Sequence, residues 1–301
     1  MKLAVSWVVV AFHRPESLRR MLAAAMPDVE VIVVNIEGDP AVTAAATEAR
    51  SDATVIETAT NVGYAAGVNL GVDAARADVV VFSNDDLVVP PDGMAALAAV
   101  VAAGEADVAL PALRLPTGER EPAALALPSP WALLKEWALL PDRRVSWLDR
   151  CLVVEKWRQP MTAERIEAGT AAIVAVRRDV LLEEPMPESY FLYWEEMEWF
   201  WRLATRGLIV QARPEIEVVH LGGRDDVRPD KSRLLARNAV RCVRRTQGRM
   251  AAVRGYAAVL LWQVRLVFVD GLRASAGRCD VPLRSRVAGF SAAAGSWREL
   301  A

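Results

Sequence analysis

Two adjacent carboxylates stand at the end of an apolar stretch of the chain. Asn84, Asp85 and Asp86 occur in FSNDDLVVPPDG (82–93), directly after the run ADVVV (77–81). Adjacent carboxylates repel each other and are costly to remove from water. A divalent cation would relieve this repulsion, because Mg²⁺ or Mn²⁺ takes oxygen ligands and typically uses one or two carboxylates together with phosphate oxygens. A solvated loop in which Asp or Asn prepares the next helix start explains the same residues, so this stretch alone leaves both interpretations open.

A second acidic group opens a predicted helix within YFLYWEEMEWFWRL (190–203). Glu195 and Glu198 are explained by the helix dipole and by a Glu198–Arg202 pair one turn apart. The Trp and Phe residues around them suggest more, because aromatic walls beside a carboxylate raise its pKa and suit a general base near neutral pH. Flat aromatic faces also suit sugar rings, although core packing is the commoner use of Trp. The candidates for a base are Glu195 and Glu196.

Further motifs suit phosphate groups. Gly63 and Gly67 in NVGYAAGVNLG (61–71) allow close backbone approach at a helix N-terminus, a place suited to phosphate, although Gly also serves turns and packing. His220 in VVHLGG (218–223) ends a strand before a Gly pair, where a satisfied structural histidine is the alternative. One helical face in LLARNAVRCVRR (234–245) carries Arg237, Arg241 and Arg244, for which phosphate recognition and a solvated face are both consistent.

Alternating strands and helices must position these residues. VSWVVVAF (5–12) and EVIVVN (30–35) are continuous Val-rich runs, typical of strands covered on both faces. Helical spacing separates them, and Pro15 marks a helix start. The alternation continues as helix, strand, helix and strand over 40–50, 53–58, 64–76 and 77–83. This pattern predicts an α/β fold whose parallel sheet binds ligands at the carboxyl ends of its strands, where the polar loops above begin.

The second half of the chain is less regular. Residues 111–167 are rich in Pro and Trp, and so long a segment inside a compact domain usually forms a functional insertion or a lid. A strand running into a helix is expected at 169–182, and two short strands at 208–223. From 231 onward the pattern is helical and basic. We therefore predict an α/β domain over 1–230, in halves 1–110 and 111–230, and a basic helical segment over 231–301.

The net charge of −2 gives no sign of a nucleic-acid partner, but the charge is unevenly distributed. Residues 231–301 hold 14 Lys and Arg against 3 Asp and Glu, which is +11 and leaves −13 for residues 1–230. Such a segment suits an anionic surface, lipid headgroups first, while a solvated Arg-rich helix face is the simpler alternative. Its apolar run at 256–270 is interrupted by Arg265 and is too short to span a membrane.

Cysteine and histidine usage restricts the remaining classes. Cys151, Cys242 and Cys279 are far apart, so they form neither a disulfide framework nor a metal-ligand spacing. With only two histidines, a zinc site is not expected. These features favour a reduced, cytoplasmic protein, at the inner face of the membrane if the basic segment binds lipid.

The order of the motifs resembles the family 2 glycosyltransferases of the GT-A type, particularly bacterial rhamnosyltransferase-like members. The matching pieces cover roughly residues 5–245: VVVAFHRPESL, VIVVNIEGD, NVGYAAGVNLG, VVFSNDDLVV, AGTAAIVAVRRDVL, ESYFLYWEEMEWFWRLATRG, ARPEIEVVHLGG and ARNAVRCVRR. The resemblance implies a GT-A, Rossmann-like sheet with helices on both faces. Residues 1–110 would bind a nucleotide-diphosphate sugar, and 111–230 would form the acceptor and catalytic half.

The resemblance also gives roles to single residues. Asp86, the last acid of a DXD-like motif, and His220 would bind a divalent cation, Mg²⁺ or Mn²⁺, at the diphosphate. Glu196 stands where the family has the Asp that acts as general base, with Glu195 beside it as the second candidate. Positions matched to the donor site are Phe12, Arg14, Asn35, Asn61, Gly63, Gly67, Asn69, Asn84, Asp85 and Arg237, and those matched to the acceptor or sugar are Gly169, Thr170 and Trp194.

Together these assignments predict a metal-dependent inverting glycosyltransferase of the hexosyltransferase type. Its partners would be a UDP, dTDP or GDP sugar and a glycan, lipid-linked or small-molecule acceptor. Asn35 replaces the Asp with which the family usually contacts the nucleobase, so the nucleobase stays open. A catalytically silent relative that serves as a partner subunit is the alternative, and a sugar nucleotidyltransferase is disfavoured because FHRPES (12–17) lacks glycine. The basic segment would contact a membrane peripherally or form a homodimer.

Overall fold

A computed structural model describes residues 4–121, 123–125, 127, 165–222, 229–275, 287, 290, 291 and 293–300. These residues fall into two compact units. The first contains the described residues up to 125 and those of 165–222, and the second contains Leu127 and those of 229–300. Most of the insertion expected at 111–167 lies outside the described residues, and the domain boundary expected at 230/231 stays a prediction.

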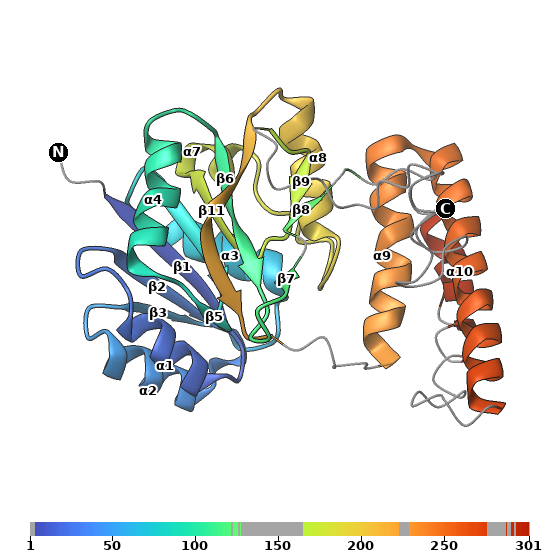
Figure 1. The fold of residues 1–301 in the computed structure, drawn as a ribbon, viewed down its shortest axis with the longest axis horizontal. Helices are drawn as coiled ribbons and strands as arrows, with labels where there is room; N and C mark the ends of the chain where they lie inside the picture. Colours follow the sequence, from blue (N-terminus) through green and yellow to red (C-terminus); the bar gives the residue numbers. More distant parts are fainter. Residues whose placement is uncertain are drawn as a thin grey trace. The chain divides into compact units, whose positions relative to one another are not determined.

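The first unit is built around a mixed sheet, which has nine strands in the described part of the chain (Figure 1). The main path runs β3-β2-β1-β4-β10-β6-β11-β5, and β7 pairs with β6. As predicted, β1 to β4 run parallel, whereas β10 is antiparallel to β4 and β6. The strands are β1 (Val5–Ala11), β2 (Glu30–Asn35), β3 (Thr54–Glu57), β4 (Val79–Asn84), β5 (Leu87–Val88), β6 (Val108–Arg114), β7 (Arg120–Glu121), β10 (Ile173–Arg177) and β11 (Val210–His220), beside a separate pair of β8 (Ala124–Leu125) and β9 (Ala168–Gly169).

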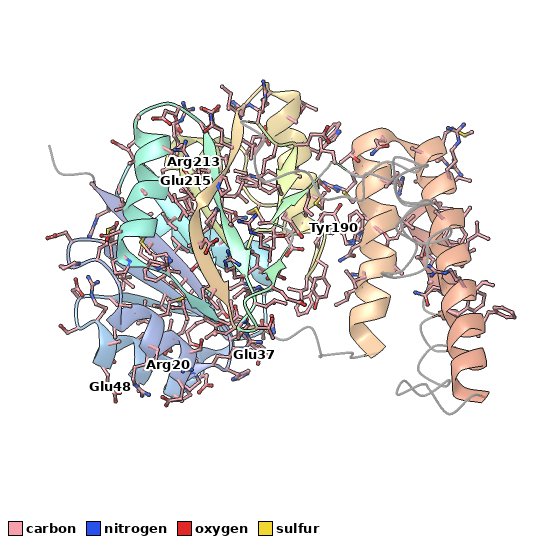
Figure 2. All side chains as sticks on the ribbon, viewed as in Figure 1. Arg20, Glu37, Glu48, Tyr190, Arg213 and Glu215 are labelled. Atoms are coloured by element: carbon pink, nitrogen blue, oxygen red, sulfur yellow. The ribbon has the colours of Figure 1, made fainter. Side chains whose placement is uncertain are left out.

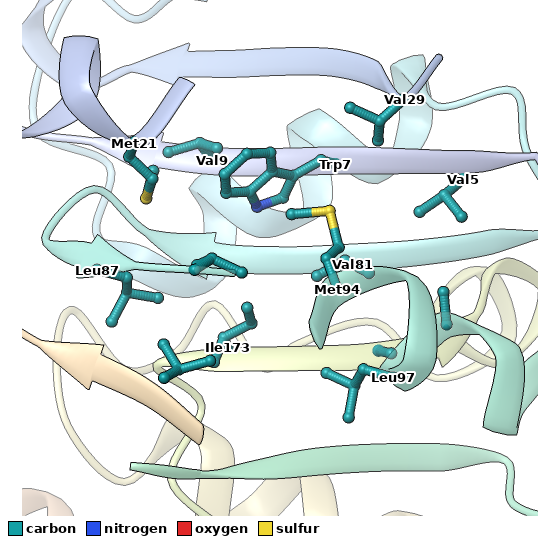
Figure 3. Packing of buried hydrophobic residues seen from close by; sticks show 14 of the residues in the cluster. Val5, Trp7, Val9, Met21, Val29, Val81, Leu87, Met94, Leu97 and Ile173 are labelled. Carbon is teal, nitrogen blue, oxygen red and sulfur yellow. The ribbon is translucent and has the colours of Figure 1, made fainter. Parts of the chain in front are cut away.

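One face of this sheet is covered by α1 (Pro15–Ala23), α2 (Pro40–Ala49) and α4 (Pro91–Ala102). Each of these helices begins with Pro, which fits the first turn because no N–H is needed there. Trp7 lies in the middle of the core beneath them and is fully buried (Figure 3). Its indole N–H donates to Ser83 Oγ at 2.9 Å, so the polar atom of this core aromatic is satisfied.

The opposite face is covered by α3 (Tyr64–Ala74), α7 (Arg178–Glu183) and α8 (Glu195–Thr205). Helix α3 lies so close to β1 that a Cβ on Gly71 would come closer than 3.0 Å to the side chain of Val8. Phe82 of β4 and Trp199 of α8 meet edge-on, with ring centroids 5.9 Å apart. Trp199 and its neighbour Phe200 are fully buried, so they serve core packing and not a sugar platform. The layering confirms the predicted α/β fold with helices on both faces.

Two strands differ from the prediction, and proline explains both. Strand β6 was not predicted, because Pro111 in its middle lacks the N–H that a central strand needs. The segment 208–223 was expected to form two short strands but forms the single strand β11. Its register against β6 shifts between Arg213 and Glu217, around Pro214 and just after Arg213 pairs with Pro111. The two prolines are therefore accommodated at one irregularity.

The second unit is helical, as predicted. Helices α9 (Pro229–Gln247) and α10 (Arg249–Ser275) pack against each other and against a short 3-10 helix, η3 (Gly295–Leu300). Arg241 donates two hydrogen bonds to Glu299, at 2.8 and 3.1 Å, and Arg244 donates to the Glu299 carbonyl at 3.2 Å. These two arginines therefore bind within the unit and do not form a solvated face. In the described residues, no helix has the length and apolar character needed to cross a membrane.

Candidate active site

The site begins where β1 and β4 end side by side. Asp85 follows β4, and its Oδ2 accepts a hydrogen bond from the backbone N–H of Phe12, which follows β1, at 2.8 Å. Asp85 is buried, and burial raises its pKa to about 6, although the Phe12 hydrogen bond opposes this. Asn84 ends β4, and its N–H donates to Ala172 at 2.9 Å. These bonds fix the loops at the carboxyl edge of the sheet.

Asp86 is buried between two cationic side chains. Its Oδ2 accepts a hydrogen bond from Arg14, and its Oδ1 lies 3.4 Å from His220 Nε2. Burial would raise the pKa of Asp86, but His220 and Arg14 outweigh burial and lower it. The Oδ1 atom is buried and has no hydrogen-bond partner among the described residues, since 3.4 Å is too long for a well-formed bond. Asp86 Oδ1 therefore faces the imidazole and can still accept a hydrogen bond or bind a cation.

His220 is held by a carboxylate that the sequence did not reveal. Its Nδ1 lies 2.8 Å from Oε2 of Glu121, at the end of β7, so Nε2 is the nitrogen that faces Asp86. Burial would lower the pKa of His220, but Asp86 and Glu121 outweigh it and raise the pKa to about 9. The nearby Gly222 leaves the space open, because a Cβ there would lie 2.5 Å from Asp86 Oδ2 and 2.9 Å from His220 Nε2.

These residues fit a divalent cation that is shared with a phosphate ligand. Asp86 Oδ1 and His220 Nε2 are two adjacent donors, and a carboxylate on the other ring nitrogen, here Glu121, is the usual support of a metal-binding histidine. A metal ion would replace the proton that His220 otherwise carries. No group of three His, Cys, Asp or Glu that could hold a metal occurs within the described residues. The ion would therefore take its remaining ligands from phosphate and water, as Mg²⁺ usually does.

The acids at the start of α8 have three different environments. Glu198 accepts a hydrogen bond at 2.6 Å from the hydroxyl of Tyr190, the residue labelled in Figure 2. It also accepts one from Arg202, which confirms the predicted Glu198–Arg202 pair. Glu195 is buried, and its Oε2 has no hydrogen-bond partner among the described residues. Burial, together with the charge of Glu196, raises the pKa of Glu195 well above its ordinary value. Glu196 is only partly buried, and burial raises its pKa as well.

The turn that leads into α8 has an unusual backbone. Tyr193 and Trp194 both have positive φ angles, 68° and 77°, although neither is glycine. Such conformations cost about 1–3 kcal/mol each and persist only where the surroundings impose them. Here the preceding loop is held by α3, because the Gly63 backbone lies against the Phe191 carbonyl and Asn69 exchanges hydrogen bonds with the Met186 backbone at 2.9 and 3.0 Å.

Tyr64 is a buried titratable group whose pKa both acidic groups affect. It lies in the first turn of α3, and its hydroxyl donates to the Ala171 carbonyl at 2.7 Å. Burial raises the pKa of Tyr64, and four carboxylates raise it further: Glu195, Glu196, Asp86 and Asp85. The hydrogen bond to Ala171 also fixes Tyr64 beside the end of β4, because the next carbonyl, that of Ala172, accepts from the Asn84 N–H. Neither Tyr64 nor Glu121 carried a signal in the sequence beyond its residue type.

Several residues that the resemblance matched to the donor site have structural partners. The buried Asn35 donates to the Asp39 carbonyl at 2.8 Å and to Thr43 at 2.9 Å, so its amide holds its own loop. The Asn69 amide holds the loop before α8, and Asn61 Oδ1 accepts from the Gly63 N–H at 3.1 Å. A Cβ on Gly67 would lie 2.9 Å from Val10, so this glycine allows α3 to pack on β1. Packing, the simpler interpretation of these glycines, thus has direct support, and their contact with phosphate stays a prediction.

The remaining predicted contacts lie in three places. Gly169 ends β9, and Thr170 follows it and donates its N–H to the Ala123 carbonyl at 2.9 Å. Trp194 is buried. Phe12, after β1, and Phe191, before α8, have 40% and 42% of their surface exposed. Arg237 lies on α9 in the second unit and donates to Asn238 at 3.2 Å. Contacts of these residues with donor or acceptor stay predictions.

Comparisons with known proteins agree with this arrangement. The model of the family described as glycosyl transferase family 2 matches residues 6–174. Two similar solved structures are GalNAc-T7 with UDP, GalNAc and Mn²⁺ (16% identity, TM-score 0.57, 80% of this chain and 48% of that chain) and the mannosyltransferase PcManGT from Pyrobaculum calidifontis in complex with GDP-Man and Mn²⁺ (14% identity, TM-score 0.56, 99% of this chain and 88% of that chain). This chain thus spans about half the length of the GalNAc-T7 chain, and identities this low show the fold alone. No curated protein matches the sequence.

Proposed function

The chain belongs to glycosyl transferase family 2 and has the GT-A fold, and on that premise we propose that it is a metal-dependent inverting glycosyltransferase. Its donor would be a nucleotide-diphosphate sugar and its acceptor a hydroxyl group. The observation that carries the proposal is the geometry around Asp86, which accepts a hydrogen bond from Arg14 and faces His220 Nε2 at 3.4 Å. Carboxylates after β4, two cationic side chains beside them and the acids at the start of α8 are the parts that this transfer needs.

Glu196 is the proposed base because it stands at the family position of the base and the other two acids of α8 are less suited. Glu195 is buried, at 4% exposure, and burial together with the charge of Glu196 raises its pKa well above the ordinary value, which favours its uncharged form. Glu198 is already engaged by Tyr190 and Arg202. Burial raises the pKa of Glu196, which makes it a stronger proton acceptor than an ordinary glutamate. These environments support Glu196 as the proposed base among the three acids of α8.

The reaction would be a single displacement. The acceptor oxygen attacks the anomeric carbon from the side opposite the diphosphate, its proton passes to Glu196, and the bond between carbon and diphosphate oxygen breaks with its electron pair going to that oxygen. Asp86 and His220 would hold the divalent cation, which when bound supplies positive charge to the leaving diphosphate. Arg14, which contacts Asp86, adds a second positive charge at this edge of the sheet. Attack from the opposite side gives inversion.

The two similar structures support a divalent cation and a nucleotide or nucleotide-sugar ligand, since both contain Mn²⁺, one with UDP and the other with GDP-Man. The nucleobase of this chain's donor is left open among UDP, dTDP and GDP, because the buried Asn35 binds its own loop. The hexosyl type, the rhamnosyl subtype and the class of acceptor are parts of the proposal that need a substrate panel. Release of nucleoside diphosphate from UDP, dTDP and GDP sugars, with and without Mn²⁺, is the first test. Binding without release would favour the catalytically silent relative.

A matched pair of variants tests the base. Glu196→Gln keeps the shape and removes the proton acceptor, so kcat should fall by ~10²-fold or more while donor binding is retained. Glu195→Gln should have a much smaller effect, because burial already favours the uncharged form that Gln resembles. Single-turnover kinetics and calorimetric donor binding are the measurements. An inactive Glu195→Gln beside an active Glu196→Gln would reverse the assignment.

A further inference from the structure

Helix α10 carries an apolar stripe that nothing in the described chain covers. Its members are exposed to different degrees: Met250 72%, Val253 44%, Leu261 51%, Val264 51% and Phe268 66%. At 100° per residue they fall within an arc of about 80°, and at 1.5 Å per residue they extend over about 27 Å. Ala257, also exposed, lies within the same arc. We call these six residues the α10 stripe.

The opposite side of α10 is the one that builds the second unit. Ala252, Val259 and Gln263 are buried, and they lie about 120–160° around the helix from the centre of the stripe. Tyr256 anchors this side, because its hydroxyl donates to the Ala294 carbonyl at 2.9 Å. The packing of α10 on α9 and η3 therefore uses one apolar face and leaves a second one in contact with solvent. A contiguous exposed apolar face usually marks an interaction surface.

Arginines border the α10 stripe, and acids are absent from it. Arg254 and Arg265 lie within about 40° of Leu261 on one side, and Arg249 lies about 40° beyond Val253 on the other. Arg249 and Arg254 are exposed, and Arg265 is partly exposed. The sequence from 249 to 269 contains no Asp or Glu. Arginines beside an apolar face can keep their guanidinium groups in water while their stems extend the apolar surface.

This charge pattern decides between the two occupants that fit an apolar stripe. A second copy of the chain would bring the same arginines toward one another in a twofold contact, with no acid on the stripe to pair with them. An anionic lipid surface supplies both an apolar layer for the stripe and negative headgroups for its borders. We propose that the α10 stripe binds the surface of an anionic phospholipid membrane, with α10 lying along the interface. The proposal is independent of the proposed transferase activity.

The structure narrows the predicted lipid contact of the basic segment to particular residues. Arg241 and Arg244 bind Glu299 within the second unit, so they contribute little to the lipid surface. The lipid contact is carried by the stripe and its bordering arginines on α10. A membrane location also suits a transferase with a lipid-linked acceptor, although the surface would bind vesicles that contain no acceptor.

Vesicle flotation of the full chain tests the proposal. The wild type should float with phosphatidylcholine vesicles that contain phosphatidylglycerol, and should float far less with phosphatidylcholine alone or at high salt. The double variant Leu261→Ser, Phe268→Ser should lower the binding to anionic vesicles at least ~10-fold, because each residue loses most of its apolar surface. The double variant Arg254→Gln, Arg265→Gln should weaken binding to anionic vesicles and leave the small binding to neutral vesicles unchanged.

Leu182→Ser is the matched control, because Leu182 is a similarly exposed leucine (48%) on α7 of the first unit. Circular dichroism should show that all variants keep the melting temperature of the wild type, since the altered side chains are exposed. Equal flotation of the stripe variant and the control would overturn the proposal. So would light scattering that shows a dimer lost only in the stripe variant, because the stripe would then bind a second copy. Release of nucleoside diphosphate should be the same in all three variants, which separates a failure here from a failure of the proposed function.

Discussion

Replacing Gly63 by Ala distinguishes a packing role of this glycine from a phosphate-binding role. Gly63 has φ 84° and ψ 172°, a region that is essentially restricted to glycine, so a side chain there costs about 1–3 kcal/mol. In addition, the new Cβ would come closer than 3.0 Å to the Phe191 carbonyl, a backbone atom that moves only with its loop. Overpacking of this kind costs about 1–3 kcal/mol. The two costs together predict a loss of about 2–6 kcal/mol in the free energy of unfolding.

Thermal unfolding measures this loss, and a second glycine calibrates it. For a domain of this size the melting temperature should fall by roughly 5–20 °C. Gly104→Ala is the control, since Gly104 also has a positive φ of 72° but nothing lies within 4 Å of its Cβ position. That variant should lose only about 1–2 kcal/mol, the cost of the left-handed backbone. Equal losses in both variants would show that the Phe191 loop does not lie against Gly63.

The same variant has a kinetic signature. The loop at Phe191 leads directly into Trp194 and the acids of α8, so a displaced loop should lower kcat by moving Glu196. If Gly63 serves only the approach of a phosphate group, Gly63→Ala should raise the KM for the donor and leave the melting temperature near that of Gly104→Ala. The pair of measurements therefore separates the two roles.

Two further predictions follow from the site. Glu121→Gln should lower the affinity for Mn²⁺ ~10–100-fold in the presence of a nucleoside diphosphate, measured by calorimetry, because it weakens the support of His220; Glu217→Gln, which removes an ion pair with Arg114 at 2.6 Å on the same sheet, should leave this affinity unchanged. The acid limb of the kcat profile should lie above 4.5, the ordinary pKa of a glutamate, since burial raises the pKa of Glu196 and a base works only in its deprotonated form. Activity is then lost as the pH falls through the raised pKa, and a limb at or below 4.5 would contradict this role of Glu196.

The first half of the fold could be predicted from the sequence because the signals for its strands and helices are local. Strands β1, β2 and β4 are continuous Val-rich runs, and the prolines at the starts of α1, α2 and α4 mark helix beginnings within a few residues. Strand β6 carried the opposite signal, since Pro111 argues against a central strand. The structure accommodates it by an irregular pairing with β11, a property of two segments about a hundred residues apart that no local pattern contains.

The same limit applies to the site. Asp85 and Asp86 were predicted because adjacent carboxylates need an explanation, and Glu195 and Glu196 because aromatic residues flank them. Tyr64 and its bond to the Ala171 carbonyl depend on how α3 packs near the end of β4, so the tyrosine was missed. Asn35 and Asn69 were matched to the donor site by position in a motif, but their amides are bonded within the protein. Position in a motif therefore predicts where a residue lies better than it predicts what the side chain contacts.

The pairing of Asp86 with two cationic side chains implies that the proposed metal would serve the ligand and not the fold. Arg14 and His220 already compensate the Asp86 charge without an ion, and they lower its pKa against the effect of burial. Removal of divalent cations with a chelator should therefore leave the melting temperature of the nucleotide-free protein unchanged. Mn²⁺ alone should raise it little, because two protein donors bind weakly, whereas Mn²⁺ with a nucleoside diphosphate should raise it more than the sum of the two added separately, since each ligand then completes the site of the other. A stabilisation by Mn²⁺ alone as large as that by the pair would mean that further protein groups hold the ion, and the ligand set would have to include more than Asp86 and His220.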